Sequence, residues 1–465
     1  MADFSRKLKV FTLYVVSFFV LLTAIFYSTV PFFRKDGRSD NVIPVTKEAK
    51  KTKNYIYSVT MSPVGTVYFE HVPQRVLTGD ANYNEMLVAT RDAHKIMKTS
   101  YQTDEKEGFY ARIPNFQSGL NWDVINTNIN TSERMTFDKE LLYQLKSDIH
   151  HLDPIQVMQW KGWSLDDVEE VTKNVGPFFA NRGSRDYPMD RPKIAPYFLS
   201  SPKENSKEVL AAHADVTCAE TKKDVPSPPD MSDVISLPEV QNYEVYTLWE
   251  LSDKVAQVYQ KQEVVEKIKG MAERMAAEIQ AKLPPPEKRP RVGLLFFGHN
   301  HFTPFRLLNG GFGQAQYHVV QAHDAFDMLE CYGNGVYRRP SAAGSTTAAG
   351  TTTDLEALVA CNPDIIIFPM ALSPKNEPLF QELLKLQEDP VAKNINAFKN
   401  NRVYPGGTPF QGPIYFLFQV EMAAKQIYPE IFGVFRKKHD YCKEEQLFSR
   451  EELAQILKEA ENEKE

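Results

Sequence analysis

The sequence predicts an α/β fold with two related lobes behind an N-terminal transmembrane anchor. Three observations carry this prediction: a helix–turn–strand pattern that occurs twice, buried-strand segments that alternate with helical segments, and a long apolar run near the first residue. A chain of 465 residues is too long for one hydrophobic core, so two domains are expected.

The repeated unit is clearest in residues 354–368, DLEALVACNPDIIIF. Leucine and valine recur there at helical spacing until Asn362-Pro363 stops the helix, because a residue before proline avoids the helical region. The run Ile365–Phe368 is wholly apolar, as in a strand that is buried on both faces of a parallel sheet.

The first copy lies about two hundred residues earlier, in residues 138–154. In each copy a glutamate, Glu140 or Glu356, leads the helix, and an aspartate eight positions later, Asp148 or Asp364, precedes the strand. Two copies of one unit indicate two related lobes.

Composition excludes some classes of function. With 42% apolar and 25% charged residues and a net charge of −6, the chain is an ordinary globular protein and has no basic face for nucleic acid. The cysteines lie far apart without a CxxC motif, which predicts neither a zinc site nor a disulfide framework but buried free thiols. They are Cys218, Cys331, Cys361 and Cys442.

The first 35 residues are expected to form a signal anchor. Val10–Phe33 is an uncharged run of about 24 residues, which at roughly 1.5 Å per residue can cross a bilayer. Its end offers no good cleavage site, although a cleaved signal peptide is the alternative. Basic residues flank both ends, so charge alone does not decide the orientation. Residues 36–56 are then a linker.

Residues 57–244 are expected to form the N-terminal lobe. It would open with a β-hairpin over residues 55–69, followed by a strand in Val72–Asp80 and a helix over Tyr83–Thr90. This order places Thr78–Asn82 at the carboxyl end of a sheet, where open α/β sheets bind ligands. Ser164 is expected to cap a helix, and residues 186–241 form an irregular insertion.

Residues 245–283 predict two helices joined near Lys261. The C-terminal lobe, residues 261–444, would begin with the strand Arg291–Phe297 and end with the apolar helix Pro413–Tyr428. Residues 445–465 are charged and are expected to form a solvated tail.

Several stretches together resemble the periplasmic-binding-protein family for iron-siderophore, haem and cobalamin uptake. Val72–Val76 with Glu85 is similar to the family's opening strand and helix, and the two Glu–Asp units are similar to its xLExLLALxPDLII signature. Asp389-Pro390 and residues 396–404 are similar to its DPxW…AVKNGRVY ending. The chain departs from the family at Ser147, where proline is usual, and it has no lipoprotein cysteine.

The resemblance implies two Rossmann-like lobes joined by a long rigid α-helix, here residues 245–260. It also implies a protein of the cell membrane, single-pass and extracytoplasmic in bulk, that captures a metal chelate and delivers it to an ABC permease and its ATPase. A ferric siderophore is the first choice of ligand, a corrinoid such as cobalamin the second and haem the third; no resident cofactor and no catalytic residue are expected. In the family one glutamate per lobe docks on the permease, and Glu140 and Glu356 match these positions.

A flat or chelated ligand needs aromatic walls and a few cationic or hydrogen-bonding groups. Candidates at the ends of strands and in the loops beyond them are Asp80, Asn82, Tyr83, Trp160, Trp163, Arg182, Arg185, His299, His301, Arg306 and Tyr415. For each tryptophan, core packing is an equally good explanation.

Two alternatives stay open. A related type of binding protein holds bare Zn²⁺ or Mn²⁺ through histidines, and the C-terminal lobe offers His299, His301, His318 and His323. Chelatase-like enzymes share the two-lobed architecture, but no nucleophile–base pair stands out, and the Ser/Thr residues before Glu356 are explained as helix caps.

Overall fold

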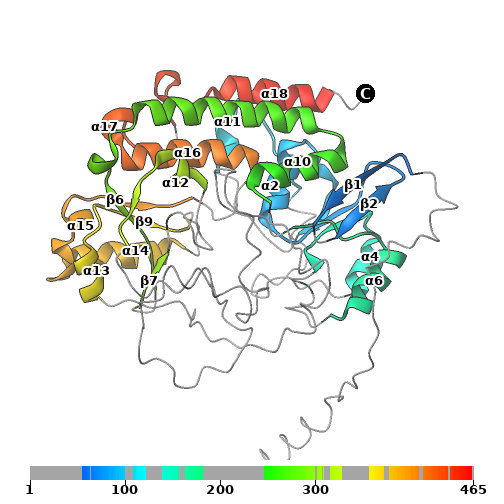
Figure 1. Cartoon of the computed structure of the whole chain (residues 1–465), viewed down its shortest axis with the longest axis horizontal. Helices are drawn as coiled ribbons and strands as arrows, with labels where there is room; N and C mark the ends of the chain where they lie inside the picture. The colour runs from blue at the N-terminus through cyan, green and yellow to red at the C-terminus, as the bar shows by residue number, and fades with distance from the viewer. Residues whose placement is uncertain are drawn as a thin grey trace, which may run out of the picture. The chain divides into compact units, whose positions relative to one another are not determined.

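The computed structural model shows an α/β fold with parallel sheets (Figure 1). It describes residues 55–62, 64–99, 108–121, 139–154, 157, 163–181, 246–298, 301–305, 307, 315–326, 355–370, 376–407, 412–437 and 440–462. All of these belong to one compact unit, Val45–Glu465. The predicted anchor, the linker up to residue 54 and the insertion 186–241 lie outside the described residues.

The N-terminal sheet is built around β3 (Val76–Thr78), which pairs in parallel with β4 (Ile96–Thr99) and β5 (Ile149–His151). The predicted hairpin precedes it as β1 (Tyr57–Met61) and β2 (Gly65–Phe69), paired antiparallel. The helical segments of this part are α2 (Ala81–Ala89), η3 (Phe109–Arg112), α4 (Lys139–Leu145) and α6 (Leu165–Asn174).

The C-terminal sheet is built around β6 (Arg291–Gly298), which pairs in parallel with β9 (Ile365–Phe368). All residues of β9 are buried, as expected for a strand covered on both faces. Further strands are β7 (His301–Phe305), β8 (His323–Asp324) and β10 (Val403–Pro405), of which β7 alone is antiparallel. The accompanying helices are α12 (Ala315–Val320), α13 (Leu355–Cys361), α14 (Glu377–Lys385), α15 (Asn396–Lys399) and α17 (Pro429–Phe432).

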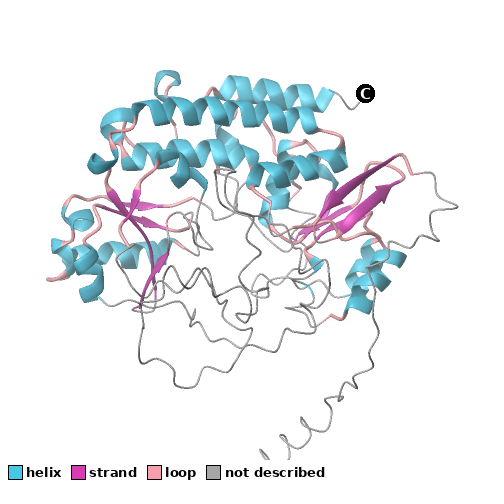
Figure 2. Ribbon diagram, in the orientation of Figure 1, coloured by secondary structure: helices cyan, strands magenta, loops and turns pink. Residues whose placement is uncertain are grey.

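A helical layer accompanies the two sheets, which Figure 2 draws as separate groups of strands. It contains α10 (Leu248–Tyr259), α11 (Gln262–Lys282), α16 (Pro413–Ile427) and α18 (Arg450–Asn462), and α11 packs against each of the other three. The predicted break near Lys261 is confirmed, because Gln260 adopts a left-handed conformation with φ 55°. Every residue of α16 is buried.

The charged C-terminal end was expected to be a solvated tail, and for residues 450–462 this is wrong. The apolar face of α18, which includes Leu453, Leu457 and Ala460, is buried in the same core as α11 and α16. Apart from the buried Arg450, its charges lie on the opposite face, so a composition rich in lysine and glutamate conceals an amphipathic helix.

Candidate functional site

The two repeated units end in the same hydrogen-bonded latch. In the first unit Asp148 donates its backbone N–H to the carbonyl oxygen of Arg75 at 2.8 Å, and its Oδ2 accepts from the backbone N–H groups of Gln74 and Arg75 at 2.8 and 2.9 Å. This latch ties the start of β5 to the start of β3, the central strand of its sheet.

The second unit repeats the latch at β6. Asp364 donates its backbone N–H to Arg291 O at 2.9 Å and accepts from the Arg291 N–H through Oδ2 at 3.0 Å. A left-handed residue lies two positions before each aspartate, Lys146 with φ 47° and Asn362 with φ 43°. The aspartates of both units therefore serve the sheets, and this role explains their recurrence without a ligand.

Among the hydrogen bonds of the described residues, none ties the leading glutamate of either unit to a sheet. Glu140 and Glu356 are both exposed and lie in the first turns of α4 and α13. The neighbouring residue Lys139 pairs with Asp167 and with Glu170, and its hydrogen bond to Asp167 raises the pKa of the lysine. This network fixes α4 on α6, so Glu140 projects from a held helix.

At the carboxyl end of the N-terminal sheet a buried chain of side chains joins two strands. Thr78 donates from Oγ1 to Asn84 Oδ1 at 2.6 Å, and Asn84 Nδ2 donates to Thr99 Oγ1 at 3.1 Å. Asp80 accepts from the Asn82 N–H at 3.0 Å and so caps α2. These bonds hold the strand ends from which the loops of a binding site would start.

A second buried network is centred on His151 at the end of β5. Its Nδ1 lies 2.8 Å from the carbonyl oxygen of Phe179, which can only accept, so Nδ1 carries the proton and Nε2 accepts from the hydroxyl of Tyr259 at 2.9 Å. Tyr83 stacks on the imidazole at 5.0 Å. Burial lowers the pKa of His151 to about 4, so the ring is neutral at physiological pH.

The structure places part of the predicted ligand set. Tyr83 is buried, and its hydroxyl donates to Asn181 O at 2.7 Å. Trp163 is half-buried, packs edge-on against Phe178 and has Lys139 Nζ 5.9 Å from its ring, on the α4–α6 side. Tyr415 is buried in the first turn of α16 against Phe109, with ring centroids 5.0 Å apart.

The other ligand candidates follow strand ends but lie outside the described residues, and of His301 only the backbone is described. They are Trp160, Arg182, Arg185, His299 and Arg306. Whether these residues meet at one ligand stays a prediction.

No protein-family model matches the chain, and no curated protein matches it. Its structural neighbours are iron and siderophore substrate-binding proteins of ABC transporters, at low sequence identity. They include a periplasmic binding protein from Veillonella parvula, with 14% identity over 80% of this chain and 90% of that chain at a TM-score of 0.45. The iron-uptake protein PiuA from Streptococcus pneumoniae has 11% identity over 80% of this chain and 98% of that chain, at a TM-score of 0.46. FeuA from Bacillus subtilis has 14% identity over 76% of this chain and 94% of that chain, at a TM-score of 0.41.

His323 and His301 lie at opposite ends of β6. The backbone of His323 pairs with Arg291 at the amino end of β6, whereas the backbone of His301 pairs with Gly298 at its carboxyl end, about 20 Å away at roughly 3.3 Å per residue. Among the described residues no group of three or more His, Cys, Asp or Glu side chains could hold a metal ion. His323 and His301 are therefore too far apart along β6 to hold one zinc or manganese ion.

Sequence reasoning missed the buried charges of α16. Glu421 pairs with Arg450 of α18 at 2.8 Å, and both side chains are buried. Lys425, one turn later, donates from Nζ to the carbonyl oxygens of Phe432 and Glu445 at 2.6 and 2.7 Å. A glutamate and a lysine at i and i+4 inside an otherwise uncharged helix were the available signal.

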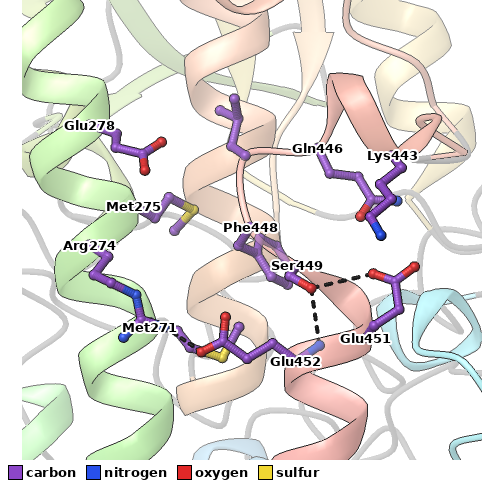
Figure 3. A pocket seen from close by; sticks show the side chains of 11 residues that line it. Met271, Arg274, Met275, Glu278, Lys443, Gln446, Phe448, Ser449, Glu451 and Glu452 are labelled. Carbon is purple, nitrogen blue, oxygen red and sulfur yellow. Dashed lines mark hydrogen bonds and ion pairs between the residues drawn. The ribbon is translucent and has the colours of Figure 1, made fainter.

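A groove of about 280 Å³ lies between α11 and the start of α18 (Figure 3). Figure 3 shows Arg274 paired with Glu452 across it and Ser449 bonded to Glu451. Arg274, Glu451 and Glu452 thus have partners within the protein, and we assign the groove no ligand. No helix in the described part of the chain is long and apolar enough to span a membrane.

Proposed function

We propose that the chain is the extracytoplasmic substrate-binding component of an ABC importer, anchored by residues 1–35, and that it captures a metal chelate between two Rossmann-like lobes. The observation that carries the proposal is the duplicated latch. Each unit ends in an aspartate that fastens its own sheet and begins with an exposed glutamate on a short helix. A duplicated surface carboxylate on two separately built sheets suits a partner that contacts both.

Glu140 and Glu356 would dock on arginines of the permease, with the ATPase beneath it. A single exposed ion pair contributes about 0–1 kcal/mol, so each contact is weak, but two fixed carboxylates define register and orientation. Lys139, held by Asp167 and Glu170, supports this role by fixing α4.

The ligand would be a ferric siderophore first, then cobalamin or haem. Arginine side chains such as Arg182, Arg185 and Arg306 pair bidentately with carboxylate or catecholate oxygens, and the tryptophans supply flat walls. Binding of Zn²⁺ or Mn²⁺ by His323 together with His301 is disfavoured by their separation along β6. We propose binding without turnover.

The ligand is tested by tryptophan-fluorescence titration of the chain from about Lys35 onward, with ferric siderophores, cobalamin, haemin and free Zn²⁺ or Mn²⁺. Saturable quenching by one chelate and not by the free ions is expected. Quenching by the free ions alone, or no response to any ligand, contradicts the proposal.

Docking is tested by reversing both charges in Glu140→Lys/Glu356→Lys and measuring ligand affinity and uptake in cells that express the permease. The affinity should stay the same, while uptake should fall at least tenfold, because about 1.4 kcal/mol is lost over two contacts. The matched control is Asp166→Lys/Glu377→Lys, which reverses acidic residues in the first turns of α6 and α14 and costs the same helix-dipole energy. Equal uptake by the two double variants would refute the docking role.

A further inference from the structure

The connection between the two sheets has one break, at Gln260. On its N-terminal side α10 is fastened to the N-terminal part, because Tyr57 donates its hydroxyl to Val258 O at 2.6 Å and Tyr259 bonds to His151. On its C-terminal side α11 runs for 21 residues and leads through consecutive prolines to β6. The end of α10 next to the break is thus fixed to the N-terminal part, and a helix pair can change its angle most easily at the left-handed residue between its two helices.

The residue after the break is tied to the C-terminal helix. Lys261 is buried, and its Nζ donates to the carbonyl oxygen of Ala460 at 2.9 Å. Ala460 lies in the last turn of α18, where carbonyl groups lack helical partners and the helix dipole favours a positive charge. Lys261 therefore links the break to the end of a helix about two hundred residues later in the chain.

The other end of α18 is anchored on a different helix. Arg450 pairs with Glu421 of α16 at 2.8 Å, and its guanidinium lies 3.8 Å from the ring centroid of Phe448. Between its two ends α18 runs antiparallel to α11, since Glu452 pairs with Arg274 and Glu459 pairs with Lys267.

The last turn of α18 also reaches the N-terminal part. Glu461 pairs with Arg91, just after α2, at 3.1 Å, and Arg91 donates in turn to Gln117 O at 2.7 Å. α18 thus contacts α16 at its first turn, α11 along its length, and Lys261 and Arg91 at its last turn.

We propose that α18 is a strap that holds the α10–α11 break at one angle and so restricts relative motion of the two sheets. The strap acts through its two anchored ends: Glu421–Arg450 fixes its first turn on α16, and the bond from Lys261 to Ala460 O fixes the break to its last turn. This inference goes beyond the proposed function, because it concerns the conformational range of the chain whatever ligand is bound.

The test is amide hydrogen exchange, read by mass spectrometry, on the chain from about Lys35 onward. Lys261→Met should accelerate exchange of residues 258–264 by about tenfold or more, because a hydrogen bond from a charged group is lost at the break. The matched control is Lys458→Met, which changes an exposed lysine of α18 and should leave the exchange rates of residues 258–264 unchanged.

The decisive variant releases the far end. Glu421→Gln/Arg450→Met removes both partners of the buried pair, while the buried Lys425 keeps its hydrogen bonds to the carbonyl oxygens of Phe432 and Glu445. Arg450 lies about 15 Å along α18 from Ala460, at roughly 1.5 Å per residue, and its guanidinium bonds to Phe448 O and Glu421. Faster exchange at residues 258–264 in this variant supports a strap. Faster exchange confined to α18, or none at all, overturns the inference, since α18 would then only cover α11.

Discussion

Acid should destabilise this protein mainly through two adjacent buried histidines. Burial lowers the pKa of His151 from 6.5 to about 4, and burial with the neighbouring charge of His151 lowers the pKa of His150 to about 3. The unfolded chain binds protons at both residues below about pH 6.5, while the folded chain does not. The stabilising contribution of the two neutral histidines is therefore fully present above this pH and is lost as the pH falls towards the folded pKa values.

The magnitude follows from these shifts. A pH of about 5 is roughly 1.5 units below the unfolded pKa of each histidine. The free energy of unfolding therefore falls by about 2 kcal/mol per histidine and by about 4 kcal/mol for the pair. The geometry gives the reason for the cost at His151. Its Nδ1–H already donates to Phe179 O, so a second proton must go on Nε2, where the Tyr259 hydroxyl now donates.

The assay is urea unfolding at about pH 7.5 and about pH 5, comparing the wild type with His151→Gln. The variant is less stable at both values, but its loss on acidification should be smaller than that of the wild type by about 2 kcal/mol. His94→Gln, which removes an exposed histidine, is the control and should lose as much stability between the two pH values as the wild type. An acid loss in His151→Gln equal to that of the wild type would refute the reasoning.

Three further predictions concern stability. Arg450→Met alone should cost about 3–5 kcal/mol in urea unfolding because it leaves Glu421 buried and unpaired, whereas Glu421→Gln/Arg450→Met should cost much less; equal costs would contradict a buried ion pair. Gly176→Ala should destabilise by about 1–3 kcal/mol, since its Cβ would lie 2.6 Å from the backbone oxygen of Ser147. Gly270→Ala, in the interior of α11 with its nearest neighbour at 3.7 Å, should instead stabilise by about 0.5–1 kcal/mol, and a loss of stability there would argue against the packing described.

Local patterns identified most elements of the fold. The apolar run of β9, the hairpin before β3, the Ser164 cap of α6 and the break near Lys261 were all read from the sequence, and the structure confirms them. Each depends on residues close in the chain, through strand burial, turn geometry, capping or helical period, so neighbouring residues suffice to specify it. The repeated units were found in the same way, and with them the exposed glutamates.

The contacts between distant segments were decided only by the tertiary structure. Nothing near Asp148 indicates that its carboxylate accepts from Gln74 and Arg75, and the charged end of the chain gave no sign that Ala460 meets Lys261. Such contacts join residues far apart in sequence, and they form only when folding places a donor beside an acceptor so that their hydrogen bond offsets the cost of taking both from water. For this reason the sequence alone determined the α/β units and their duplication, whereas the latch, the histidine network and the strap emerged only once the chain was folded.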